Sequence, residues 1–100
     1  MPLPVGDARL KPHRKAEARH LLTEQVRELQ AQSRDDLLSL LNAPKWATLR
    51  GPSGTEFQVE VQAFWDDRPG EDLRVMVSID DGGWRAFVPL TDGFIVRPAQ

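Results

Sequence analysis

Two histidines and two glutamates recur on one predicted helix, and these residue types could bind a metal ion. The residues on this stripe, at i, i+4, i+7 and i+11, are His13, Glu17, His20 and Glu24. The Glu17-to-His20 spacing is the one used by carboxylate-bridged metal bundles, which take matching ligands from a facing helix. The segment that follows has no histidine and offers only Asp35 and Asp36. The sequence therefore predicts a solvated helix face and no metal site.

Other arrangements that carry catalysis are missing from the sequence. The chain has no cysteine, which excludes thiol nucleophiles, disulfides and thiolate metal sites. It has no Gly-x-Ser-x-Gly elbow, phosphate-binding loop or dinucleotide fingerprint, and Gly-Pro-Ser-Gly at 51–54 is typical of a turn. The sequence favours a protein that is not an enzyme and needs no cofactor.

Charged residues gather in two segments of opposite sign. The basic residues between positions 9 and 20, against a single acidic one, are Arg9, Lys11, Arg14, Lys15 and Arg19. Such an arm could bind nucleic acid, but no aromatic residues for base stacking are interleaved with it, so we do not expect that partner. The acidic loops at 66–72 and 80–81 fit no calcium-loop spacing, and we interpret them as solvated turns.

The length and composition allow one small globular domain of 100 residues, with 40% hydrophobic and 28% charged residues. We interpret the proline-rich stretch 1–12 as a flexible tail and 13–100 as a single domain. No apolar run approaches the roughly 20 residues of a membrane helix, and the N-terminus lacks the pattern of a secretory signal. The net charge is −2, and the sequence predicts a cytoplasmic protein without membrane contact.

Residues 13–43 have the pattern of helix. They contain no glycine or proline, and Ala18, Leu22, Val26 and Leu29 form an apolar stripe. Ser33 could cap a second helix, so we expect two helices broken near Ser33, with one long helix as the alternative. The helical region should end at 42–44, since proline disfavours helix in its predecessor.

From Trp46 onward, apolar residues alternate with polar ones, which is typical of half-buried strands. The expected strands cover 46–50, 57–65, 73–79 and 84–90, with a last short one at 94–97. Three turns set their register, and the strongest is Asp81-Gly82, a two-residue hairpin signal. The pairs expected across the turns are Ile79–Trp84, Val77–Ala86 and Val75–Val88; Trp65–Leu73, Ala63–Val75 and Val61–Val77; and Arg50–Thr55 and Trp46–Val59.

These turns agree on one apolar face, which would include the three tryptophans Trp46, Trp65 and Trp84. We therefore predict an α+β domain in which one or two N-terminal helices pack on one face of a four-stranded antiparallel meander of order 1-2-3-4.

The opposite face of this predicted sheet carries a small apolar patch. Its expected members, with two arginines beside them, are Phe64, Met76, Phe87, Arg74 and Arg85. Met76 should lie opposite Phe87. Exposed apolar patches mark interaction surfaces, so we expect a non-enzymatic protein-interaction domain that binds a protein partner or forms a homodimer. One alternative is an enzyme with a shallow site of Glu60, Gln62, Arg74 and Arg85; another is a nucleic-acid binder that uses the basic arm.

The segments 51–66, 78–87 and 89–95, which include Ser-Ile-Asp-Asp-Gly-Gly-Trp-Arg-Ala-Phe and Pro-Leu-Thr, resemble a group of small uncharacterised bacterial proteins. The resemblance covers the last half of the chain and the leucine-rich helix before it. It implies a bacterial cytoplasmic protein and brings no activity, cofactor or functional residue with it.

Overall fold

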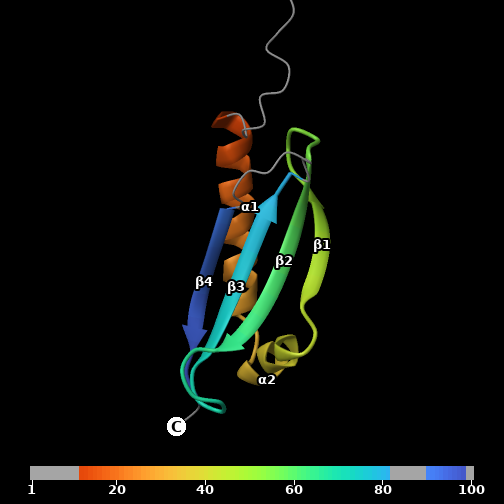
Figure 1. Ribbon diagram of the computed structural model, residues 1–100. Helices are drawn as coiled ribbons and strands as arrows, with labels where there is room; N and C mark the ends of the chain where they lie inside the picture. The colour runs from red at the N-terminus through yellow and green to blue at the C-terminus, as the bar shows by residue number, and fades with distance from the viewer. Residues whose placement is uncertain (1–11, 82–89, 99–100) are drawn as a thin grey trace, which may run out of the picture.

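The structure is a computed structural model that describes residues 12–81 and 90–98. In these residues the elements, in chain order, are α1 (Pro12–Gln30), α2 (Arg34–Leu38), the 3-10 helix η1 (Ser39–Leu41), β1 (Lys45–Arg50), β2 (Glu56–Trp65), β3 (Leu73–Asp80) and β4 (Leu90–Val96). Figure 1 shows α1 behind the sheet, along β3 and β4, with α2 near one end of the sheet. Residues 1–11, which were expected to form a flexible tail, lie outside the described part.

The helical region is divided as the sequence predicts. α1 ends at Gln30, and α2 begins after Ser33, whose hydroxyl accepts a hydrogen bond from the Asp36 backbone N–H at 3.1 Å. Asp35 and Asp36 occupy the first turn of α2, where the helix dipole favours negative charge. The prediction of two helices is confirmed, and the alternative of one long helix is wrong.

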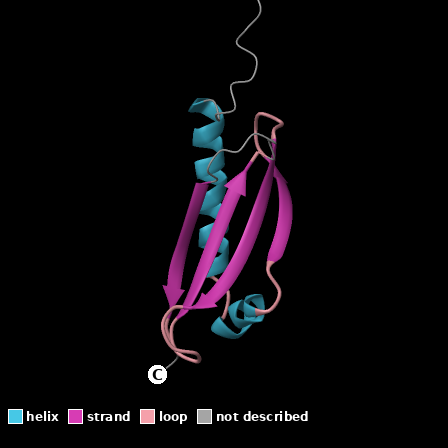
Figure 2. Ribbon diagram, viewed as in Figure 1, coloured by secondary structure: helices cyan, strands magenta, loops and turns pink. Residues whose placement is uncertain are grey.

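The four strands form one antiparallel sheet in the order β1-β2-β3-β4, which confirms the α+β class and the meander (Figure 2). The register between β2 and β3 is the predicted one, with Trp65 opposite Leu73, Ala63 opposite Val75 and Val61 opposite Val77. In this register every second side chain of both strands projects toward α1 and α2. We call this side of the sheet the inner face and the opposite side the outer face.

The register between β1 and β2 differs from the prediction by one residue. Arg50 pairs with Glu56 instead of Thr55, and Trp46 pairs with Glu60 instead of Val59. The cause is the turn: Gly54 adopts φ +87°, and Gly54 N–H donates to the Gly51 carbonyl at 2.9 Å. A type I turn followed by a left-handed glycine adds one residue to a hairpin loop. Because of this addition Trp46 projects from the outer face, where it is 69% exposed.

The fourth strand is also different from the expected one. β4 comprises Leu90–Val96 and pairs with β3 so that Ile79 lies opposite Leu90 and Val75 opposite Phe94. Because β2 and β4 occupy the two edges of β3, the predicted pairing of 84–90 with β3 is wrong. The run 90–96 brings Leu90, Phe94 and Val96 against the core beside α1. Residues 82–89, including Trp84, lie outside the described residues.

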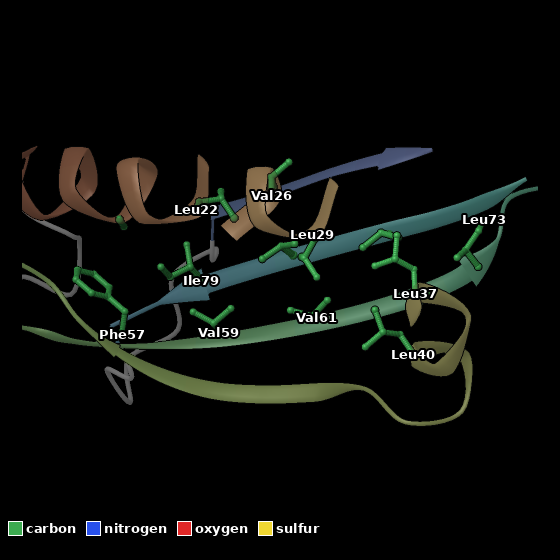
Figure 3. Packing of buried hydrophobic residues seen from close by; sticks show 14 residues of the cluster. Leu22, Val26, Leu29, Leu37, Leu40, Phe57, Val59, Val61, Leu73 and Ile79 are labelled. Atoms are coloured by element: carbon green, nitrogen blue, oxygen red, sulfur yellow. The ribbon is translucent and has the colours of Figure 1, made fainter. Parts of the chain in front are cut away.

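The core lies between the inner face and the helices (Figure 3). Its fully or nearly fully buried members on the strands are Phe57, Val59, Val61, Ala63, Leu73, Val75, Val77 and Ile79. Ala18, Leu22, Val26 and Leu29 of α1 pack on them, as do Leu37 and Leu40. Trp65 is partly buried at the margin of this core. Fully burying one of the valine, leucine, isoleucine or phenylalanine side chains of this core contributes roughly 1.5–3 kcal/mol to the stability of the fold.

Candidate functional site

A row of three side chains crosses the outer face near the loop that joins β2 and β3. Phe64 of β2 lies opposite Arg74 of β3, and Arg74 lies opposite Ile95 of β4. The two apolar residues remain 47% and 39% exposed, respectively. Strand pairing therefore places an aromatic and an aliphatic side chain on either side of an arginine.

The next row along the outer face adds a methionine. Met76 lies between Gln62 and Gly93 and is half-buried. A Cβ atom on Gly93 would lie 2.8 Å from the Met76 sulfur, so the thioether occupies the space that this glycine leaves open. We call Phe64, Arg74, Met76 and Ile95 together the outer patch.

Arg74, the charged member of the outer patch, is held by an acidic residue of the adjoining loop. Its Nε and one terminal nitrogen lie 2.8 and 2.7 Å from a single Asp66 carboxylate oxygen. A partly exposed pair of this kind contributes at most about 1 kcal/mol to stability. Its main effect is to fix the guanidinium toward the loop, so the arginine stem crosses the patch in one direction.

The structure brings together three of the five predicted partner-binding residues. Phe64, Arg74 and Met76 share the outer face, while Arg85 and Phe87 lie outside the described residues. The expected position of Phe87 opposite Met76 is wrong, because Gly93 occupies that place in β4. Ile95 was not among the predicted members, because the short strand expected at 94–97 was given no partner and 84–90 was expected beside β3 instead.

The polar residues of the outer face interact mainly with one another. Gln62 donates to the Glu60 carboxylate, and Arg50 pairs with Glu56 at 3.2 Å. Glu60, Gln62 and Arg74, which the enzyme alternative requires, do share this face. However, the guanidinium of Arg74 is engaged by Asp66.

A cavity of about 200 Å³ lies beside β1, on the inner side of the sheet. Its floor is Val59 and Val61; its walls come from β1 and the C-terminal half of α1. The lining residues from β1 are Lys45, Trp46 and Ala47, and those from α1 and the turn after it are Gln25, Glu28, Leu29 and Gln32. The cavity exists because α1 runs along β3 and β4, and because Ala47 is short.

Three members of the helix stripe that suggested a metal, Glu17, His20 and Glu24, have other partners, and the side chain of His13 lies outside the described residues. The Glu17 carboxylate accepts hydrogen bonds from the Ser53 backbone N–H and hydroxyl, each at 2.7 Å. His20 lies 3.1 Å from the Glu24 carboxylate. Among the described residues, no group of three or more histidine, cysteine, aspartate or glutamate side chains is arranged to hold a metal ion.

Of the basic arm, the structure describes only the side chains of Lys15 and Arg19, which are exposed on α1. Arg9 and Lys11 precede the described residues, and the side chain of Arg14 is outside them. In the described part of the chain, no helix has the length and apolar character needed to cross a membrane.

Comparisons with models of known protein families, with curated proteins and with solved structures find no match to this chain.

Proposed function

We propose that this chain is a small protein-interaction domain that binds a protein partner, either a different chain or a second copy, through the outer patch. The observation that carries the proposal is the row Phe64, Arg74 and Ile95, two exposed apolar side chains flanking an arginine. Aromatic residues and arginine are enriched among the residues that dominate binding energy at protein interfaces.

The contacts of Arg74 favour this interpretation. A side chain that is already ordered in the free protein loses less conformational entropy when a partner covers it. The Asp66 carboxylate orders Arg74 in this way and leaves its aliphatic stem between Phe64 and Ile95. The patch alone is smaller than the roughly 1,200–2,000 Å² that a stable interface buries. We therefore expect the partner to extend over Gln62 and Glu60 as a polar rim.

The proposal needs no cofactor, and we place the protein in the cytoplasm. A chain without cysteine gains no disulfide from an oxidising compartment.

The test introduces a charge at the centre of the patch. Phe64→Glu should weaken capture of the partner from the native cell, or self-association, at least tenfold, since a carboxylate would have to be desolvated in the interface. Gln58→Glu is the matched control, because Gln58 is exposed on the same strand and face but distant from the patch. Equal capture and equal assembly state for both variants would refute the proposal.

A further inference from the structure

β1 forms one edge of the sheet, and its backbone groups divide into two sets. The Gly51 N–H donates to the Thr55 carbonyl at 2.9 Å, which closes the hairpin. In an antiparallel ladder the residues that bond to a given neighbour alternate along the strand. The β1 residues whose N–H and C=O groups point toward β2 are therefore Lys45, Ala47 and Leu49. Those of Trp46, Thr48 and Arg50 point away from it, toward the free edge.

β1 is also the least covered strand on its inner side. Lys45 and Ala47 are exposed although they lie on the inner face, and the cavity separates them from α1. Trp46, on the outer face, has the largest exposed fraction among the large hydrophobic residues described. In the described part of the chain, β1 pairs with β2 alone. Among the residues that the structure describes, none pairs with the outer edge of β1, so within this part of the chain that edge is available to a further strand.

We propose that a second copy of this chain pairs antiparallel with β1, with the two-fold axis at Thr48, so that the two four-stranded sheets become one. In this register Thr48 lies opposite Thr48 of the second copy, and Trp46 lies opposite its Arg50. All three outward-pointing residues then exchange hydrogen bonds with the second copy. The register centred on Ala47 would set Arg50 opposite Pro44, which has no N–H to donate.

The side chains of β1 are compatible with this pairing on both faces. On the outer face Arg50, whose guanidinium pairs with Glu56 of its own chain, would lie beside the Trp46 ring of the other copy, an attraction between a cation and an aromatic face. On the inner face Leu49 of one copy lies opposite Ala47 of the other, and so adds an apolar side chain at the open side of the cavity. Lys45 faces Gly51, so like charges are not directly opposed.

The pairing would also stop at two copies. A two-fold interface uses the same edge of both chains, and after it forms neither β1 edge is free. Pro44 and Pro52 flank the strand and limit how far the ladder can extend. This interface is distinct from the outer patch, which lies toward β3 and β4, so the two can be tested separately.

The first experiment measures the solution mass of the chain by analytical ultracentrifugation up to about 1 mM, where an association of roughly 4 kcal/mol becomes visible. The wild-type protein should reach twice its mass of 11.3 kDa. Thr48→Pro removes an N–H that points away from β2, so it should weaken dimerisation roughly tenfold or more and leave the circular dichroism spectrum unchanged. Thr48→Val, which keeps the N–H, is the matched control. Phe64→Glu should leave this dimer intact.

A second experiment does not depend on how well Thr48→Pro folds. The chain has no cysteine. A single introduced cysteine can therefore form a disulfide only with the same residue of a second copy. Directly opposite residues in a hydrogen-bonded pair have Cα atoms about 5.5 Å apart, within the range of a disulfide. Thr48→Cys should therefore cross-link to a covalent dimer on mild oxidation. Gln58→Cys, equally exposed but one strand further in, would be ~14 Å from its counterpart and should not.

Two results would overturn the proposal. One is a wild-type monomer at about 1 mM, including a monomer whose edge binds a strand of a different protein. The other is cross-linking of Thr48→Cys no faster than that of Gln58→Cys. A dimer that Phe64→Glu dissociates and Thr48→Pro does not would assign self-association to the outer patch instead.

Discussion

The Glu17 carboxylate in α1 accepts two hydrogen bonds from Ser53, one from its backbone N–H and one from its hydroxyl, each at 2.7 Å. Ser53 lies in the turn between β1 and β2. This contact therefore ties the first half of α1 to the end of a hairpin that is otherwise distant in sequence. It also explains why a glutamate on the solvated stripe of α1 is half-buried.

Removing this carboxylate should loosen the hairpin from the helix. Glu17→Ala leaves the Ser53 N–H and hydroxyl without their acceptor, and we expect a loss of about 1–2 kcal/mol in the free energy of unfolding, since the site is partly open to water. Urea denaturation measures the change. Glu24→Ala is the control, because its exposed pair with His20 should contribute little. Equal effects for the two variants would contradict a specific role for Glu17.

The effect of substituting Gly51 on stability should depend on the presence of Glu17. A Cβ atom at Gly51 would lie 2.6 Å from the Glu17 carboxyl carbon, so Gly51→Ala forces the flexible glutamate away from Ser53. We expect this substitution to destabilise the wild-type protein by about as much as Glu17→Ala does, near 1–2 kcal/mol, and to have little effect in the Glu17→Ala background. A double-mutant cycle measures the coupling. Strictly additive effects would show that the cost of Gly51→Ala does not arise from the hydrogen bonds of Glu17.

The strands could be predicted where alternation and turn length agreed. The loop at 66–72 is compatible with a single register between β2 and β3 that puts their apolar residues on one face, and the structure has that register. At 51–54 the predicted turn lacked the additional left-handed residue, although Pro52 followed by Gly54 is typical of the longer loop. That one residue moved Trp46 from the predicted core to the outer face, because a shift of one inverts every side chain of a strand.

β4 could not be chosen from alternation alone. Both 84–90 and 90–96 contain apolar residues, and β3 has one edge available for a further strand. Whether Leu90 and Phe94 or other residues fill the space beside α1 depends on packing, which a local pattern does not report. The outer patch was accordingly predicted on β2 and β3, with Phe64, Arg74 and Met76, and missed on β4.

Arg34, the first residue of α2, should hold the loop between β2 and β3. Its guanidinium donates to the carbonyls of Gly70 and Glu71 and lies 5.9 Å from the centre of the Trp65 ring. Arg34→Lys keeps the positive charge but loses the planar guanidinium that donates to both carbonyls, so we expect the protein to be destabilised by about 1–2 kcal/mol. Hydrogen exchange should accelerate in the loop at 66–72 before it does in β3. Arg27→Lys, on exposed α1 surface, is the control; uniform acceleration in both variants would count against the contact.

Gly93 should be intolerant of any side chain. A Cβ atom there would lie 2.5 Å from the Val75 carbonyl oxygen and 2.8 Å from the Met76 sulfur. The methionine could turn aside, but the carbonyl belongs to the backbone of a central strand and cannot move without disturbing the ladder. We therefore expect Gly93→Ala to destabilise the protein by about 1–3 kcal/mol in urea denaturation.

The control for Gly93→Ala is Thr91→Ala, on the same strand and the same face, which removes atoms from an exposed position and should change stability by less than about 0.5 kcal/mol. A Met76→Ala background removes the sulfur contact but leaves the carbonyl contact. Gly93→Ala should therefore remain destabilising in that background. Full relief by Met76→Ala would instead show that the clash is with the methionine, and that β4 can shift away from the Val75 carbonyl.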